Sequence, residues 1–243
     1  MGMHRVGQYY FVNFPAISLT EWHPYSVSSG PREDTVEMHI RGLGDHTNRI
    51  VTLAKEREAK NTNNGAGAIP TTVCIDGPYG LQDFNYRTYP MILLAAGGIG
   101  VTPIIGMLKD VYDIDLSIGS IIEEPHAINT IYFLWAMPKL EDYECFRHEV
   151  ELCVAKAKLP GYPRLVPMIY ITRSKEILTY PFVAGRPKLG NIFQCMMQNH
   201  HVDDAGLVFA CGPQPLVSEL WDKSIQSTVQ GRQIDFHHEV FDF

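Results

Sequence analysis

The pattern of hydrophobic positions changes about a third of the way along the chain. Before residue 84, aromatic and β-branched residues come in short stretches separated by turn residues, which is typical of antiparallel strands. The strands are predicted over residues 8–14, 25–28, 35–41 and 72–75. A helical pattern is confined to residues 48–60, and residues 61–67 are expected to form a loop. This part therefore predicts a small antiparallel β-barrel that carries one helix.

After residue 89 the apolar stretches are continuous and alternate with helical patterns. Strands are predicted over residues 91–96, 130–136, 167–171 and 206–210, and residues 113–127 are expected to form an inserted loop. Continuous apolar runs are typical of parallel strands that are buried on both faces. We therefore predict a β-barrel domain over residues 1–86 and an α/β domain with a doubly wound parallel sheet over residues 87–243. Because the chain opens almost directly on a strand, we expect the first strands of the barrel to be missing.

A glycine-rich turn follows the first strand of the α/β domain. Gly98 and Gly100 allow the backbone to turn tightly and to approach a ligand, since they carry no Cβ. Thr102 and Pro103 then open a helix, where the missing N–H of proline costs nothing. The amino end of that helix favours a pyrophosphate. An ordinary strand-to-helix turn is the alternative interpretation.

Composition excludes several other classes of protein. The 243 residues are 45% hydrophobic and 19% charged, as in an ordinary globular protein, and the net charge of −7 with no basic run argues against nucleic acid as a partner. The apolar runs are shorter than the ~20 residues of a membrane span, and no signal peptide is visible. The five cysteines are scattered without CxxC spacing, and neighbouring histidines such as His200 and His201 rarely converge on one ion, so we expect neither a disulfide scaffold nor a metal site.

Two segments of the first domain carry candidate binding residues. In the sequence from His23 to Ser26, strand alternation would point Tyr25 and Ser26 to opposite faces, so that one side chain can stack on a ring while the other hydrogen-bonds to it. A bend with solvated serines explains the segment equally well. Further along, Arg41 offers a forked cation to phosphate oxygens, and Thr47 can cap the following helix. A solvated arginine beside a capping threonine is the alternative.

Three features of the second domain point to the same chemistry. Cys211 closes a strand at the sheet edge where α/β proteins bind ligands, so it stands near the reactive end of a dinucleotide or is a small buried hydrophobe. Arg173 and Arg186 follow a predicted strand and are candidates for a 2′-phosphate, or else are surface charges. The aromatic residues of the C-terminal tail can cover a flat cofactor ring, pin the terminus to the core, or fray.

Together, the motifs resemble the C-terminal dehydrogenase portion of the NADPH oxidase and ferric reductase transmembrane family, within the ferredoxin-NADP reductase superfamily. The resemblance runs from Gly7 to Phe241. It rests on the ordered set HPYS with SSGP, HIR, GD-x-T, DGPYG, GGIGVTP, GRP, CGP and a terminal F-x-x-E-x-F. The chain departs from the family at His46, where animal oxidases usually carry tryptophan, and at its end, where two residues follow Phe241.

The resemblance implies a role for each matched residue. Around FAD, His23, Pro24, Tyr25 and Ser26 would hold the flavin, and His39, Ile40, Arg41 and Thr47 would lie along the ribityl and pyrophosphate part. Around NADPH, the implied residues are Gly98, Gly100, Thr102 and Pro103 for the pyrophosphate and nicotinamide side, Arg173 and Arg186 for the 2′-phosphate, and Cys211, Gly212 and Pro213 for the hydride-transfer site. The residues expected to act in catalysis are Ser26, Cys211 and the terminal aromatic that covers the flavin, either Phe241 or Phe243.

The resemblance also implies the reaction. NADPH would give a hydride to FAD, which would pass single electrons to haem in a preceding membrane domain and finally to oxygen, producing superoxide. The chain would then be the cytosolic part of a membrane enzyme. A ferric-chelate reductase of the same family is the first alternative. A soluble flavin reductase that feeds an iron–sulfur partner, and a nucleotide-binding module without turnover, are the others.

Overall fold

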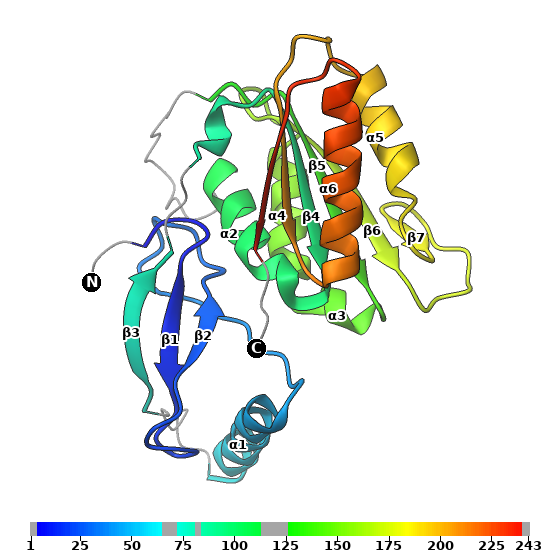
Figure 1. Cartoon of the computed structure of the whole chain (residues 1–243). Helices are drawn as coiled ribbons and strands as arrows, with labels where there is room; N and C mark the ends of the chain where they lie inside the picture. Colours follow the sequence, from blue (N-terminus) through cyan, green and yellow to red (C-terminus); the bar gives the residue numbers. More distant parts are fainter. Residues whose placement is uncertain (1–3, 65–71, 81–83, 113–125, 240–243) are drawn as a thin grey trace.

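The chain forms two sheets of different kinds, which lie side by side in Figure 1. The computed structural model describes residues 4–64, 72–80, 84–112 and 126–239. The first sheet is three-stranded and antiparallel, in the order β2-β1-β3, and the second is six-stranded and parallel, in the order β7-β6-β5-β4-β8-β9. The predicted fold class, an antiparallel domain followed by a parallel α/β domain, is confirmed.

The first sheet has a small core of its own. Its elements are β1 (Tyr9–Asn13), β2 (His23–Ser26) and β3 (Cys74–Tyr79), with α1 (Asp45–Asn64) between β2 and β3 in the chain. Val12 lies opposite His23 on one side of β1 and opposite Ile75 on the other. Tyr10, Val12 and Val27 are buried in the core of this part, which is much smaller than that of the second sheet.

Three predictions for the first domain were wrong in detail. Residues 35–41 form no strand. The backbone of Glu37 is held by Ser28 and Ser29, partly through their hydroxyl groups and not through a strand ladder. The alternation of this segment reflects the packing of Val36 and Met38 on the small core. The strand predicted over residues 72–75 is β3, which begins at Cys74 and continues to Tyr79, four residues further than expected. The helix also begins three residues earlier than expected, at Asp45, and it continues to Asn64, into the segment expected to form a loop.

The second sheet has helices on both of its faces (Figure 1). Its strands are β4 (Met91–Gly97), β5 (Thr130–Met137), β6 (Arg164–Ile171), β7 (Phe182–Ala184), β8 (Gly206–Cys211) and β9 (Ile234–Glu239). The helices are η1 (Tyr86–Thr88), η2 (Gly98–Val101), α2 (Thr102–Val111), α3 (Glu141–Glu144), α4 (Arg147–Lys156), α5 (Leu189–Gln198) and α6 (Gln214–Val229).

Strand β4 is the buried centre of the sheet. Leu94 and Ala96 face one apolar cluster, which includes residues of α2 and α4, whereas Leu93 and Ala95 face another, which includes residues of α5 and α6. Burial on both faces explains why β4 is a continuous apolar run. The sequence predicted β4, β5 and β8 closely and the second half of β6, but it did not predict the edge strands β7 and β9. Of the expected insertion, residues 113–125 lie outside the described residues.

Charged side chains of α2 fasten the two domains together. Lys109 Nζ lies 2.9 Å from Glu33 Oε1 and 3.0 Å from Glu37 Oε2. The Asp110 carboxylate lies 3.6 Å from Arg32 Nη2 of the first domain, and it also accepts hydrogen bonds from Tyr86 and Arg87 of η1. Burial alone would lower the pKa of Lys109, but its hydrogen bonds to the two glutamates raise it overall. Glu37 is partly exposed, but Lys109, Glu33 and Asp110 are largely buried, so removing one of these partners is costly. The contacts hold the domains in one orientation.

Among the described residues, every helix is too short or too polar to span a bilayer.

Candidate cofactor-binding site

The turn after β4 has room only for glycine at its centre. A Cβ on Gly100 would lie 2.3 Å from the carbonyl oxygen of Cys211 and 3.0 Å from the nitrogen of Gly212. Gly98 has a φ of +57°, a conformation that other residues rarely adopt. The chain then enters α2 at Thr102 and Pro103, as the sequence predicted. The turn is therefore packed against the end of β8 by backbone, and it leads into the amino end of a helix.

The residues at the end of β8 lie beside this turn, as expected from their positions in the sheet. Cys211 pairs with Ala96 of β4, and a Cβ on Gly212 would lie 2.8 Å from the Cα of Gly97. The Cys211 side chain is fully buried, and burial strongly raises the pKa of its thiol. The thiol therefore stays protonated and covered, and the two glycine-containing segments, with Pro213 next in the chain, present mainly backbone.

Arg41 and His39 lie at the junction between the domains. Nη1 of Arg41 is 3.3 Å from the position that a Cβ on Gly98 would take, and Nη2 is 3.8 Å from Asp142 Oδ1. The Nδ1 atom of His39 is 2.9 Å from Ser28 Oγ, and its ring packs on Phe146 with the centroids 4.2 Å apart. Burial lowers the pKa of His39, which keeps the imidazole neutral at pH 7. The sequence analysis assigned both residues to the first domain's cofactor. The structure brings Arg41 to the glycine turn of the second domain and packs His39 on Phe146, just before α4.

The segment of β2 that was assigned to the flavin is half-buried. Ser26 is 7% exposed, whereas Tyr25 packs beside the small core and its Oη is buried without a hydrogen-bond partner among the described residues. Burial raises the pKa of the Tyr25 phenol, so the hydroxyl stays protonated and able to donate. Thr47 lies in the first turn of α1, and its Oγ1 accepts hydrogen bonds from the N–H groups of Leu43 and Gly44, which shapes the loop before this helix. Pro24 and Ile40 are half-buried nearby in the chain.

Arg173 and Arg186 follow two neighbouring strands at the same edge of the sheet. They come shortly after β6 and β7, where Ile171 pairs with Ala184, and both side chains are exposed. Arg186 also lines a cavity of about 300 Å³ that Tyr170 and Ile192 share. The guanidinium groups of both arginines are therefore accessible to a ligand that binds from solvent. Phe241 and Phe243, proposed as the flavin cover, lie outside the described residues.

Sequence reasoning missed one residue that shapes the turn. The indole Nε1–H of Trp135, on β5, donates a hydrogen bond of 2.9 Å to the carbonyl of Gly98. Trp135 pairs with Ala96 in the sheet, one residue before the glycines begin. A tryptophan at the end of the strand next to a glycine turn was the available signal, because a buried indole needs an acceptor.

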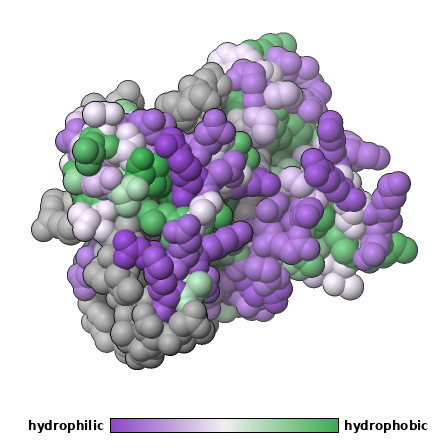
Figure 2. Space-filling model, turned by 90° about the horizontal axis from the view of Figure 1, so that it is seen from below, coloured by the Kyte–Doolittle hydropathy of each residue, from purple (hydrophilic) through white to green (hydrophobic). Residues whose placement is uncertain are grey.

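The residues at the junction fit the two cofactors that the sequence implied. The orphaned hydroxyl of Tyr25 suits a bound partner in the first domain. The close approach of backbone at Gly100 and Gly212 leaves the kind of side-chain-free cradle that a pyrophosphate requires. Figure 2 looks onto the side of the molecule at which the parallel strands end, and the surface there is largely hydrophilic.

Comparisons with known proteins match each of the two domains to a family. An FAD-binding domain family matches residues 2–83, and the ferric reductase NAD-binding domain family matches residues 89–179. The respiratory burst oxidase homolog protein B of Solanum tuberosum is 31% identical over 97% of this chain and 32% of its own length. The chain belongs to the NADPH oxidase and ferric reductase family. It is the FAD- and NADPH-binding part, an FAD-dependent NADPH oxidoreductase in class, and FAD and NADPH are its cofactors.

The chain matches only part of the length of its relatives. The superoxide-generating NADPH oxidase heavy chain of Dictyostelium discoideum is 29% identical over 93% of this chain and 46% of its own length. The chain thus spans about a third to a half of these curated relatives. Among solved structures, ferredoxin-NADP+ reductase from Plasmodium falciparum with 2′P-AMP has a TM-score of 0.61 and 13% identity, covering 98% of this chain and 84% of that one. This likeness shows a shared fold.

Proposed function

We propose that this chain is the dehydrogenase part of a membrane NADPH oxidase. The relatives named as respiratory burst and superoxide-generating oxidases support this proposal. The observation that carries it is the contact of Arg41, from the FAD-type domain, with the glycine turn of the NAD-type domain. Both cofactors would therefore meet at one junction. We divide the two domains between residues 86 and 87, in the interval between the matched families.

The protein's own groups bind and align the cofactors. Tyr25 and Ser26 lie on opposite faces of β2, so one would pack on the flavin while the other hydrogen-bonds to it, and His23, Pro24, His39 and Ile40 would complete this pocket. Arg41 and the loop capped by Thr47 would hold phosphate oxygens. The turn from Gly98 to Pro103 and the segment from Cys211 to Pro213 would support the dinucleotide. When bound, FAD accepts a hydride and returns electrons singly, and the protein supplies alignment and shielding.

Arg173 and Arg186 would select NADPH over NADH. Their guanidinium groups are exposed at the end of β6 and β7, and their fork of donors matches a phosphate. The solved reductase with 2′P-AMP shares this fold and holds a ligand with that phosphate.

The proposal is tested by mixing the FAD-loaded chain with NADPH or NADH without oxygen and following flavin absorbance in a stopped-flow instrument. Bleaching that is faster with NADPH supports it, and no bleaching with either nucleotide would contradict it. The control is free FAD at the same concentration, which measures the reaction without protein.

The later electron steps belong to the whole protein. We propose that electrons pass from this part, on the cytosolic face, to haem in a membrane domain and then to oxygen. In membranes that carry the full-length protein, cytochrome c reduction should be abolished by superoxide dismutase. Insensitivity to the dismutase together with rapid reduction of a ferric chelate would indicate the ferric reductase of the same family instead.

A further inference from the structure

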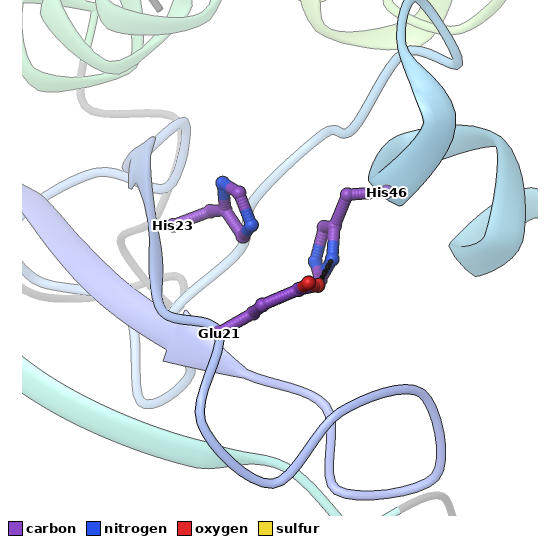
Figure 3. Close-up of side chains that lie close together, drawn as sticks. All are labelled: Glu21, His23 and His46. Atoms are coloured by element: carbon purple, nitrogen blue, oxygen red, sulfur yellow. Dashed lines mark hydrogen bonds and ion pairs between the residues drawn. The ribbon is translucent and has the colours of Figure 1, made fainter.

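A cluster of three potential metal ligands lies between β2 and the start of α1. It is formed by Glu21, His23 and His46, and their potential ligand atoms all lie within 4.8 Å of one another. Figure 3 shows the two imidazoles facing each other, with the Glu21 carboxylate reaching toward His46. Glu21 and His23 lie two positions apart, just before β2 and at its first residue, whereas His46 comes from the first turn of α1. From this cluster we propose that the chain binds one divalent transition-metal ion, of the zinc class, through these three side chains.

The donor set matches such an ion. Two imidazole nitrogens and one carboxylate oxygen form a mixed N/O set that suits zinc, whereas calcium and magnesium prefer oxygen ligands alone. Three protein ligands with a fourth position open to solvent is a common zinc arrangement. Glu21 has an exposed fraction of 44% and His46 one of 10%, so one side of the site is open to solvent while the other is covered by protein.

Two nitrogen atoms in the cluster lack a partner. The Nε2 atoms of His23 and His46 are buried and have no hydrogen-bond partner among the described residues. The rings pack with centroids 3.8 Å apart and an angle of 33° between their planes. A buried polar atom without a partner needs a physical explanation, and an ion bound at Nε2 of His23 provides one for that atom.

The protein holds the three ligands in place before any ion binds. Asn13, which is 3% exposed, donates hydrogen bonds of 2.9 Å to Ser18 O and 2.7 Å to Glu21 O, and this fixes the loop that carries Glu21. His23 is paired with Val12 in the sheet. The Nδ1 atom of His46 lies 2.9 Å from Glu21 Oε2, so the imidazole and the carboxylate already point at the same place.

The atoms must move only a little to coordinate an ion. Ligand atoms on a tetrahedral zinc ion, at about 2.0–2.1 Å from the metal, lie about 3.4 Å apart. The ligand atoms of this cluster lie within 4.8 Å of one another, so side-chain rotations that move an atom by about 1 Å bring them to coordination distance. An ion would replace the proton that His46 and Glu21 share.

Two positive charges oppose a cation here, and neither blocks the site. Arg49 Nη2 is 3.2 Å from Glu21 Oε2, and the amino end of α1 carries a partial positive charge. The guanidinium can stay on the carboxylate as an outer partner, because a carboxylate accepts at more than one position. Asp45, in the first turn of α1, offsets part of the helix charge.

Zinc titration of the full chain tests this proposal. The chain is freed of metal with a chelator and of flavin, the exposed thiols of Cys74, Cys145 and Cys195 are alkylated, and Zn²⁺ binding is measured by calorimetry. We expect one equivalent of zinc to bind to the parent. We expect the affinity to fall at least tenfold in Glu21→Gln, which keeps the shape of the side chain, and in His46→Phe, which keeps an aromatic ring at the position.

The matched control is His201→Gln. His201 is exposed and forms another histidine–carboxylate pair, with Nδ1 3.2 Å from Asp203 Oδ2. Its loss should leave zinc affinity unchanged, and circular dichroism should show that all variants are folded. The proposal fails if the parent binds no zinc, or if Glu21→Gln and His46→Phe bind it as tightly as the parent. Because the titration uses flavin-free protein, its result is independent of the proposed oxidoreductase activity.

Discussion

Adding one methyl group at Gly100 should separate the turn from the end of β8. A Cβ there would lie 2.3 Å from the carbonyl oxygen of Cys211 and 2.7 Å from its carbonyl carbon. Real Cβ contacts essentially never fall below 3.0 Å, so backbone must shift by about 0.7 Å. Overpacking of a rigid interior costs typically about 1–3 kcal/mol, and because both sides here are backbone we expect about 3 kcal/mol.

This cost can be measured as a loss of thermal stability and of nucleotide binding. For a chain of this size 1 kcal/mol corresponds to about 2–4 °C, so Gly100→Ala should lower Tm by roughly 6–12 °C. Since the shift occurs where we place the NADPH pyrophosphate, the apparent Kd for NADPH should rise as well. Differential scanning fluorimetry and a nucleotide titration by flavin bleaching provide the two readouts.

Gly190→Ala is the matched control. Gly190 lies in α5, and a Cβ there would meet nothing within 4 Å. Alanine favours helix, so Tm should be unchanged or slightly raised. A Tm for Gly100→Ala within 2 °C of the parent, together with normal NADPH binding, would refute the claim that the turn is packed too closely for a side chain.

Four further changes test other parts of the account. Arg186→Ala should reduce the preference for NADPH over NADH in flavin reduction about tenfold. Arg147→Ala, which removes an exposed ion pair, is the control and should leave the preference unchanged. An unchanged preference in Arg186→Ala would count against the 2′-phosphate assignment. Asp110→Asn should lower the free energy of unfolding by about 3 kcal/mol in a urea titration, because it breaks a buried ion pair, whereas the exposed Asp222→Asn should have little effect; equal stabilities would refute this. Burial raises the pKa of Glu239 to about 7, so between pH 5 and 7 the folded state holds a proton that the unfolded state has lost. The free energy of unfolding should therefore fall as pH rises through that window, by at most about 1.4 kcal/mol per pH unit. Glu239→Gln should remove this slope, and the same slope in both proteins would refute the prediction. Finally, if His23 serves both ligands, saturating Zn²⁺ should weaken FAD binding to the parent and not to His46→Phe, and equal FAD affinity with and without zinc in the parent would contradict the sharing.

The parts of the fold that were predicted well are those where one physical requirement dominates the sequence. β4, β5 and β8 are buried on both faces, so only apolar residues are tolerated and the run is easily seen. β7 and β9 lie at the sheet edges, where polar residues such as His237 and His238 are tolerated, and the apolar signal is lost. Residues 35–41 alternate because Val36 and Met38 pack on a core, which a strand and an extended loop do equally.

The candidate site was predictable where it depends on backbone geometry. Gly98 and Gly100 predict the turn because the backbone conformation at the first and the close approach of Cys211 at the second disfavour any side chain. The sequence does not reveal which groups from distant segments come into contact. Examples are the Trp135 indole with the carbonyl of Gly98, and Glu21 with His46. Neighbouring histidines drew attention in the sequence, whereas the cluster with ligand spacing joins His23 and His46, which lie 23 positions apart. The expectation that the chain has no metal site is therefore replaced by the proposal above.

The most direct test of the central claim uses NADPH that carries deuterium at C4. The account holds that this chain aligns the nicotinamide with the flavin for hydride transfer. In anaerobic stopped-flow mixing with the FAD-loaded chain, deuterium on one face of C4 should slow flavin bleaching, while deuterium on the other face should not. Bleaching at the same rate with both labels, or no bleaching beyond that of free FAD, would contradict the account.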